Sequence, residues 1–241
     1  MAVIAAPTDE IGHVNPHGTD SMWASIMAQA ETVPELQWPQ AVNVYRRMPR
    51  EDSRVSSLLA AIKLPIRRTN WMIDPNGADP EVVDLVAESF GLQVRGASGA
   101  PRNTKGRARN RFSWSRHLNL ALSSIQYGHS YFEQVYRFDE QSGRLYLRKL
   151  APRPQSTIAK INVALDGGLE SIEQSSAAGV VHIRNAVTLP PPIPVSRLVA
   201  YVRDPDPGDW LGESILRPAY KHWLLKDEMM RIEAATARRN G

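Results

Sequence analysis

Residues 212–241 run Gly212-Glu-Ser-Ile-Leu-Arg-Pro-Ala-Tyr-Lys-His-Trp-Leu-Leu-Lys-Asp-Glu-Met-Met-Arg-Ile-Glu-Ala-Ala-Thr-Ala-Arg-Arg-Asn-Gly241, the pattern of one long amphipathic helix. Ser214 can cap its start, and Asp227 and Arg231 stand four residues apart, as an ion pair on a helix does. The positions predicted to form one buried stripe are Leu216, Ala219, Tyr220, Trp223, Met230, Ala234 and Ala237. Such a helix needs a partner for its apolar side.

The end of this segment, Asn240-Gly241, has the pattern of a helix C-cap, because Asn and Gly accept the left-handed backbone that turns a chain into its next element. No further element follows it. We therefore expect the chain to be truncated, or only partly represented, at its C-terminus.

The composition favours an irregular α+β fold. With 241 residues the chain can bury a sizeable core, but 18 prolines and 15 glycines break it into short elements. No apolar run approaches the roughly 20 residues that span a bilayer, and the first residues lack the basic start of a signal peptide, so we expect a cytoplasm-like environment. The absence of cysteine excludes disulfides, thiolate zinc sites and thiol catalysis.

The first half of the chain predicts an arm followed by short elements. Residues 1–44 favour an extended arm with one short helix at 21–30. A helix over 51–63 has Asp52 or Ser53 as its cap and ends at Pro65, and a strand is predicted over 66–74. A second helix opens at Asp79-Pro80 and ends at Gly91. The predicted inward faces of these helices comprise Val55, Leu58, Leu59, Ile62, Val82, Val83, Leu85, Val86 and Phe90.

A β-rich insert is predicted between a third helix, residues 113–126, and the terminal one. Alternating apolar residues indicate hairpins over 130–138 with 144–150 and over 156–165 with 169–173, and further strands over 180–183 and 197–202. Among the tryptophans, Trp71, Trp114 and Trp223 are expected in the core, whereas Trp210 is expected to anchor the turn into the last helix.

The residues offer little catalytic or metal chemistry. The histidines show no ligand spacing on a predicted element, since His13 and His17 lie on a segment broken by glycine and proline. Asp204, Asp206 and Asp209 could hold a divalent cation, but a proline-fixed acidic turn is the favoured interpretation. The segment 102–111 carries five positive charges and no negative one, which could contact phosphate but is more often a solvated loop. We predict no cofactor and no resident metal.

Several short sequence motifs occur along the chain in an order that is typical of a known protein family. They are Leu64-Pro65, Trp71-Met-Ile-Asp-Pro75, Tyr127-Gly-His-Ser-Tyr-Phe-Glu133 with Val135-Tyr136, Leu150-Ala-Pro-Arg153, and Gly212-Glu-Ser-Ile-Leu-Arg-Pro-Ala-Tyr220 leading to Arg238-Arg-Asn-Gly241. In this order the chain, over about residues 45–241, resembles the N-terminal half of portal proteins of tailed phages, particularly those of actinobacterial phages. The resemblance covers no catalytic signature.

The resemblance implies a structural protein without enzymatic activity: one subunit of a ring, typically dodecameric, at a capsid vertex. Double-stranded DNA would pass through it during packaging and ejection, and its partners would be the terminase, the adaptor or head-completion protein, and the major capsid and scaffold proteins. The protein would reside in the virion and, during assembly, in the host cytoplasm.

The implied fold is phage portal-like and α+β, with wing helices and strands and with long stem helices flanking a β-rich clip insert. Its parts would be an N-terminal arm (1–44), part of the wing (45–112), a first stem helix (113–130), the clip (131–205) and a second stem helix (206–241).

Candidate contact residues follow from this assignment. Clip contacts to an acidic partner would be Arg144, Arg148, Lys149 and Arg153, although a charged strand edge that resists aggregation explains them equally well. Candidates for the DNA channel are Lys221, Lys226 and Arg231. Two alternatives remain open: a metal-dependent nuclease that uses the three aspartates of residues 204–209, and a truncated, monomeric portal relative that acts only as an interaction module.

Overall fold

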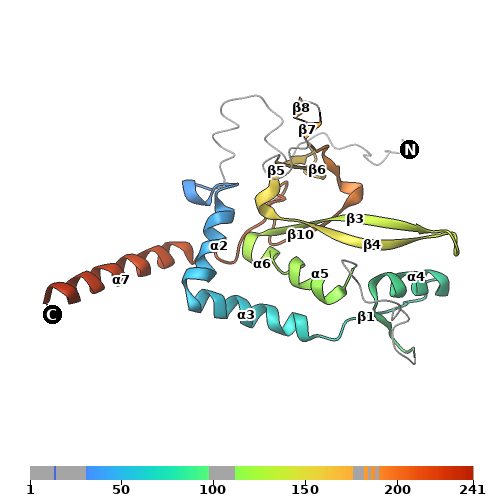
Figure 1. Ribbon diagram of the computed structural model, residues 1–241, viewed down its shortest axis with the longest axis horizontal. Coiled ribbons are helices and arrows are strands. Elements are labelled where there is room, and N and C mark those ends of the chain that lie inside the picture. The colour runs from blue at the N-terminus through green and yellow to red at the C-terminus, as the bar shows by residue number, and fades with distance from the viewer. Residues whose placement is uncertain are drawn as a thin grey trace, which may run out of the picture.

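The computed structural model describes residues 14, 31–97, 112–175, 182–183, 186–187 and 190–240. Figure 1 shows a mixed body of short helices and small twisted sheets, from which the last helix extends. The α+β prediction is confirmed at this level. Three predicted features lie outside the described residues: the helix over 21–30, the basic segment 102–111, and His13 with His17.

A helix replaces the end of the predicted arm. After a short 3-10 turn, η2 (Pro34–Leu36), α2 spans Ala41–Glu51. Its buried residues recur with helical spacing: Ala41, Val42, Val44, Tyr45 and Met48. Helix α2 crosses the predicted arm boundary at residue 44, and its apolar face belongs to the core.

Helix α3 (Ser53–Arg68) begins where the sequence predicts and ends later. The Asp52 side chain accepts a hydrogen bond from the Arg54 N–H at 2.9 Å, which confirms the predicted cap. The helix runs through Pro65, whose carbonyl still accepts from Thr69 N–H at 3.0 Å. The predicted strand over 66–74 therefore shrinks to β1 (Met72–Ile73). Leu58, predicted to be buried, is exposed.

Helix α4 (Pro80–Phe90) has the predicted bounds. Asp79 caps it through Glu81 N–H at 2.8 Å, and Gly91 ends it with a φ of 65°. Val83 is buried as predicted, whereas Val82 is exposed. The following strand, β2 (Gln93–Val94), pairs in parallel with β1.

The predicted third helix is two shorter ones, α5 (Trp114–Ala121) and α6 (Ser124–Tyr127). The hairpin that follows is confirmed: β3 (His129–Asp139) pairs antiparallel with β4 (Arg144–Arg153), and β10 (Leu198–Val202) joins the other edge of β3. Strand β4 is therefore one edge of this sheet.

The second predicted hairpin is also confirmed. Strands β5 (Ile158–Val163) and β6 (Leu169–Gln174) pair with each other, and β9 (Ile193–Pro194) extends their sheet. The 3-10 turns η3 (Gln155–Thr157) and η5 (Val195–Arg197) and a small pair, β7 (His182–Ile183) with β8 (Ala186–Val187), complete the insert. A buried cluster joins both sheets: Tyr131, Ile158, Leu169, Ile172 and Leu198.

The last helix, α7, spans Tyr220–Asn240. Residues 215–219 form turns, so the helix starts later than the sequence pattern suggests. Figure 1 shows α7 starting beside α2 and extending away from the body.

Candidate functional site

The first turns of α7 are embedded in the larger apolar cluster. Trp223 is buried there, and the Arg47 guanidinium lies over its ring, 5.6 Å from the ring centroid. The cluster draws on three distant parts of the chain: Leu36, Ala41, Val44, Tyr45, Met48, Leu59, Leu216, Tyr220 and Trp223. The start of α7 is thus fixed by η2, α2 and α3.

Polar contacts surround this anchor. The Arg217 guanidinium pairs with Glu31, and the Tyr220 hydroxyl donates to Glu35. Lys226 Nζ donates to Asp52 Oδ2 at 2.6 Å, so the cap of α3 also holds α7. This hydrogen bond, with the one from Arg54 N–H, lowers the pKa of Asp52.

Ser214 forms two hydrogen bonds in the turn that precedes α7. Its Oγ accepts from Leu216 N–H at 3.1 Å and its hydroxyl donates to the Gln126 carbonyl. The predicted cap residue therefore stabilises the turn that leads into α7 and ties it to α6.

Two glycines make the junction behind this turn possible. Gly128 and Gly212 have φ angles of 92° and 62°. A Cβ atom on Gly212 would lie 2.6 Å from the Arg203 carbonyl oxygen and 2.7 Å from that of Gly128. Only glycine fits here, because backbone from the end of α6 and from the segment before α7 meet without room for a side chain.

Beyond Lys226, every α7 side chain through Arg239 is exposed. Leu225, Met229 and Ile232, spaced four and three residues apart, are 53%, 60% and 59% exposed and lie on one face. Met230, seven residues after Trp223, continues the opposite apolar face together with Ala234 and Ala237. The predicted buried stripe is thus confirmed at Leu216, Tyr220 and Trp223, but its last three positions are exposed. This half of α7 carries two uncovered apolar faces.

The channel candidates have different surroundings. Lys221 is exposed. Lys226 is paired with Asp52, and Arg231 lies 2.8 Å from Asp227 in the predicted i,i+4 pair. The structure does not single out one basic face formed by these three residues.

The four clip candidates also differ in whether they form an ion pair. Arg144 pairs with Glu81 of α4 at 2.9 Å. Arg153 pairs with Glu133 on the neighbouring strand. Only Arg148 and Lys149, among these four, are exposed and without an ion pair in the described part of the chain.

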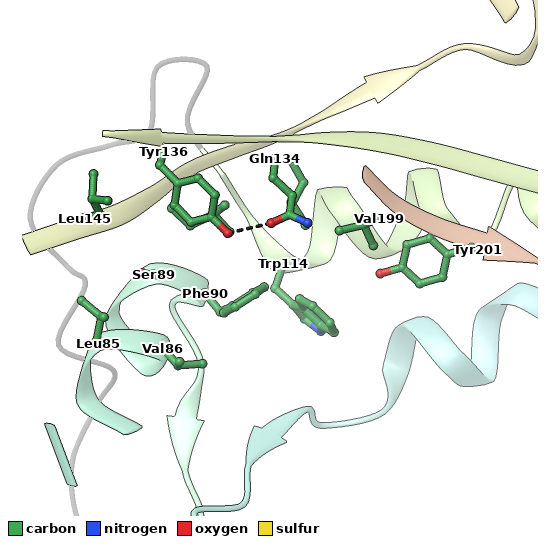
Figure 2. A pocket seen from close by; sticks show the side chains of 12 residues that line it. Leu85, Val86, Ser89, Phe90, Trp114, Gln134, Tyr136, Leu145, Val199 and Tyr201 are labelled. Carbon is green, nitrogen blue, oxygen red and sulfur yellow. Dashed lines mark hydrogen bonds between the residues drawn. The ribbon is translucent and has the colours of Figure 1, made fainter. Parts of the chain in front are cut away.

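An apolar cleft that the sequence did not predict lies between α4 and the sheet of β10, β3 and β4, with a volume of about 410 Å³. Figure 2 shows the Tyr136 hydroxyl, which donates to Gln134 Oε1 at 2.6 Å, on the sheet side. Most of the residues that line the cleft are apolar: Leu85, Val86, Phe90, Trp114, Leu145, Leu147, Leu150 and Val199. Trp71, predicted to be in the core, is 39% exposed and packs edge-on against Trp114.

The buried histidines are packing groups. His129 Nδ1 donates to the Leu211 carbonyl at 2.8 Å, and His117 Nε2 lies 2.9 Å from the Tyr201 hydroxyl. Burial lowers the pKa of each imidazole to about 4, so both are neutral near pH 7.

The acidic segment before α7 is a turn, as favoured from the sequence. Asp209 Oδ1 accepts from Leu211 N–H at 2.8 Å, and Asp204 pairs with Arg203 at 2.7 Å. Trp210 anchors the turn as predicted, donating from Nε1 to the Gly167 carbonyl at 2.9 Å. Within the described ranges, no group of three or more His, Cys, Asp or Glu residues is placed to hold a metal ion.

Two uncovered apolar faces on one exposed helix are typical of a surface that another protein chain covers. A family model described as the portal protein of Mu bacteriophage matches residues 42–241. The chain therefore belongs to this family of phage portal proteins, which are structural, non-enzymatic capsid proteins. In the described part of the chain, no helix combines the length and apolar character that crossing a membrane requires.

Proposed function

We propose that the chain is a subunit of the ring at the capsid vertex through which phage DNA is packaged and ejected. Family membership supports the portal role. Assembly is supported by the exposed half of α7, where large apolar side chains from Leu224 to Ile232 remain uncovered over about 12 Å of helix.

The two apolar faces favour a ring over a pair. In a twofold dimer the same patch meets itself, so one apolar face suffices. A heterologous ring needs two different patches on each subunit, one for each neighbour. The face with Leu225, Met229 and Ile232 and the face with Met230, Ala234 and Ala237 supply such a pair.

The finer assignment follows the sequence resemblance. We propose an arm over residues 1–44 with its end folded into α2, part of a wing over 45–112, stem helices over 113–130 and 206–241, and a clip over 131–205. Arg148 and Lys149, exposed on edge strand β4, are the best-placed clip contacts for the terminase or the adaptor protein. The order of the sequence motifs over about residues 45–241 supports the actinobacterial type.

The portal role implies the remaining partners. Double-stranded DNA passes through the ring. A typical portal ring has about twelve subunits. The wing contacts the major capsid and scaffold proteins. The virion vertex is the final location, and the host cytoplasm is the site of assembly.

The mass of the purified chain in solution tests this proposal, measured by light scattering after size exclusion alongside negative-stain images. Wild-type protein should form closed rings with a central hole. The substitutions Met229→Glu and Ile232→Glu should release folded monomers, because both side chains are exposed in the monomer.

A matched control keeps the test specific. Glu228→Gln and Glu233→Gln change two exposed positions on the same helix without adding charge to an apolar face, and rings should persist. A monodisperse wild-type monomer at all concentrations would contradict self-assembly by this chain and favour the monomeric interaction module.

A further inference from the structure

Helix α3 has a buried face and an exposed face of different chemistry. Val55, Leu59, Ile62 and Ile66, spaced four, three and four residues apart, turn toward the body, where Leu59 is buried. Figure 1 shows α3 along the lower edge of the body, with α5 on the side that faces the sheets. The opposite side of the helix is exposed over its whole length.

The exposed side carries only positive charge. No acidic residue occurs between Ser53 and Arg68, whereas the helix contains four cations: Arg54, Lys63, Arg67 and Arg68. None of the four forms an ion pair within the described ranges, in contrast to Arg144, Arg153 and Arg217 elsewhere.

Two of these cations, Lys63 and Arg67, repel each other at a place where Lys63 is partly shielded from water. Lys63 is half-buried, and burial together with the neighbouring Arg67 charge lowers its pKa. A bound anion would relieve this repulsion, because it supplies the opposite charge that the chain itself does not place there.

Small residues lie between the charges. Arg54, Ser57, Ala61 and Arg68, spaced three, four and seven residues apart, fall along one exposed row about 21 Å long. A shallow depression on this face is lined by Ser53, Arg54, Ser57, Leu58 and Ala61. Serine hydroxyls donate to phosphate oxygens, and short side chains let a nucleic-acid backbone come close.

A protein partner fits this face less well. Protein interfaces are enriched in aromatic side chains at their centres, and α3 contains none. We propose that the exposed face of α3 is a sequence-independent contact for the phosphate backbone of double-stranded DNA. The exposed cations Arg54, Arg67 and Arg68 contact phosphates, the serines assist them, and no base edge is read.

Fluorescence anisotropy with a short, labelled duplex of mixed sequence tests the contact across a series of salt concentrations. Arg67→Gln/Arg68→Gln should weaken binding about tenfold and reduce the slope of log K against log salt by roughly 0.9 for each lost phosphate contact. Arg67→Lys/Arg68→Lys should retain most of the affinity, because phosphate contact requires a cation rather than a specific fork.

The matched control is Arg137→Gln/Lys160→Gln, which removes the same charge from two other exposed residues that form no ion pair in the described part of the chain. It should leave DNA affinity unchanged. The proposal is overturned if wild-type protein does not bind the duplex, if the α3 variant binds like wild type, or if both variants weaken binding equally. The mass of the same samples is measured in parallel, so rings without DNA binding would reject this contact and leave the ring assignment intact.

Discussion

Lys226 Nζ and Asp52 Oδ2 lie 2.6 Å apart, although 174 positions separate them in the sequence. Theirs is the most C-terminal hydrogen bond between α7 and another element in the described part of the chain. Asp52 also caps α3 through Arg54 N–H. One carboxylate therefore fixes the start of one helix and the direction of another.

Asp52→Ala should lower the free energy of unfolding by about 1–2 kcal/mol, because it removes an N-cap and leaves Lys226 unpaired. Asp52→Asn keeps a capping oxygen and should lose less than about 1 kcal/mol. Urea denaturation measures both. Equal losses for the two variants would show that the charge, rather than the cap, dominates.

Gly212→Ala should destabilise the fold by at least about 2 kcal/mol, since the new methyl would meet two carbonyl oxygens at a positive φ. Gly143→Ala is the control: its φ is 65°, but nothing lies within 4 Å of the added Cβ, so backbone strain of about 1 kcal/mol is the whole cost. Thermal melting compares the variants. Similar losses would contradict the close backbone packing at the junction.

Stability should fall as the pH drops from about 6.5 to about 4. In the folded protein, burial lowers the pKa of His117 and His129 to about 4 from the ordinary 6.5. Within this window the unfolded chain binds protons that the folded chain excludes, so each histidine contributes a slope of up to about 1.4 kcal/mol per pH unit. Above the window both states are neutral and the contribution is complete.

Urea unfolding at pH 7.5 and pH 5 measures this slope, and His129→Asn tests its origin. The variant can still donate to the Leu211 carbonyl but carries no titrating ring, so its pH dependence should be smaller than that of wild type. A wild-type stability that stays flat across the window would refute the assignment.

Trp223→Ala should cost about 3–5 kcal/mol, because it empties a site inside the main apolar cluster and removes the ring beneath Arg47. Leu225→Ala, two positions later, removes a side chain that is 53% exposed and should change stability by no more than about 0.5 kcal/mol in the monomer. Chemical denaturation of monomeric protein distinguishes the two. If Leu225→Ala cost as much as Trp223→Ala, the division of α7 into an anchored and an uncovered part would be wrong.

Elements with local signals at both ends were predictable. Helix α4 has the predicted bounds because Asp79, Pro80 and Gly91 mark its start and stop within a few residues. The end of α3 was not, since Pro65 lacks only an N–H and its carbonyl remains available to Thr69. A proline near a helix C-terminus therefore does not fix where the helix stops.

Features set by distant residues escaped the sequence pattern. The break between α5 and α6 coincides with a hydrogen bond from the Ser130 hydroxyl of β3 to the Leu120 carbonyl, which an unbroken helix would use itself. The anchor of α7 depends likewise on Glu31, 186 positions from Arg217. Local spacing predicted that α7 has apolar positions but could not indicate which of them the body covers.

The long separation between Glu31 and Arg217 also bears on the order of events during folding. Contacts between distant positions form late, because the intervening chain must first be ordered. We therefore expect α7 to acquire a fixed direction only after the sheets between the two residues have formed. Pulsed hydrogen exchange should then protect the first turn of α7 no earlier than β3. In the proposed ring, a nascent or damaged subunit would have no oriented helix for its neighbours to bind, so the contacts that anchor α7 would restrict assembly to chains that have finished folding.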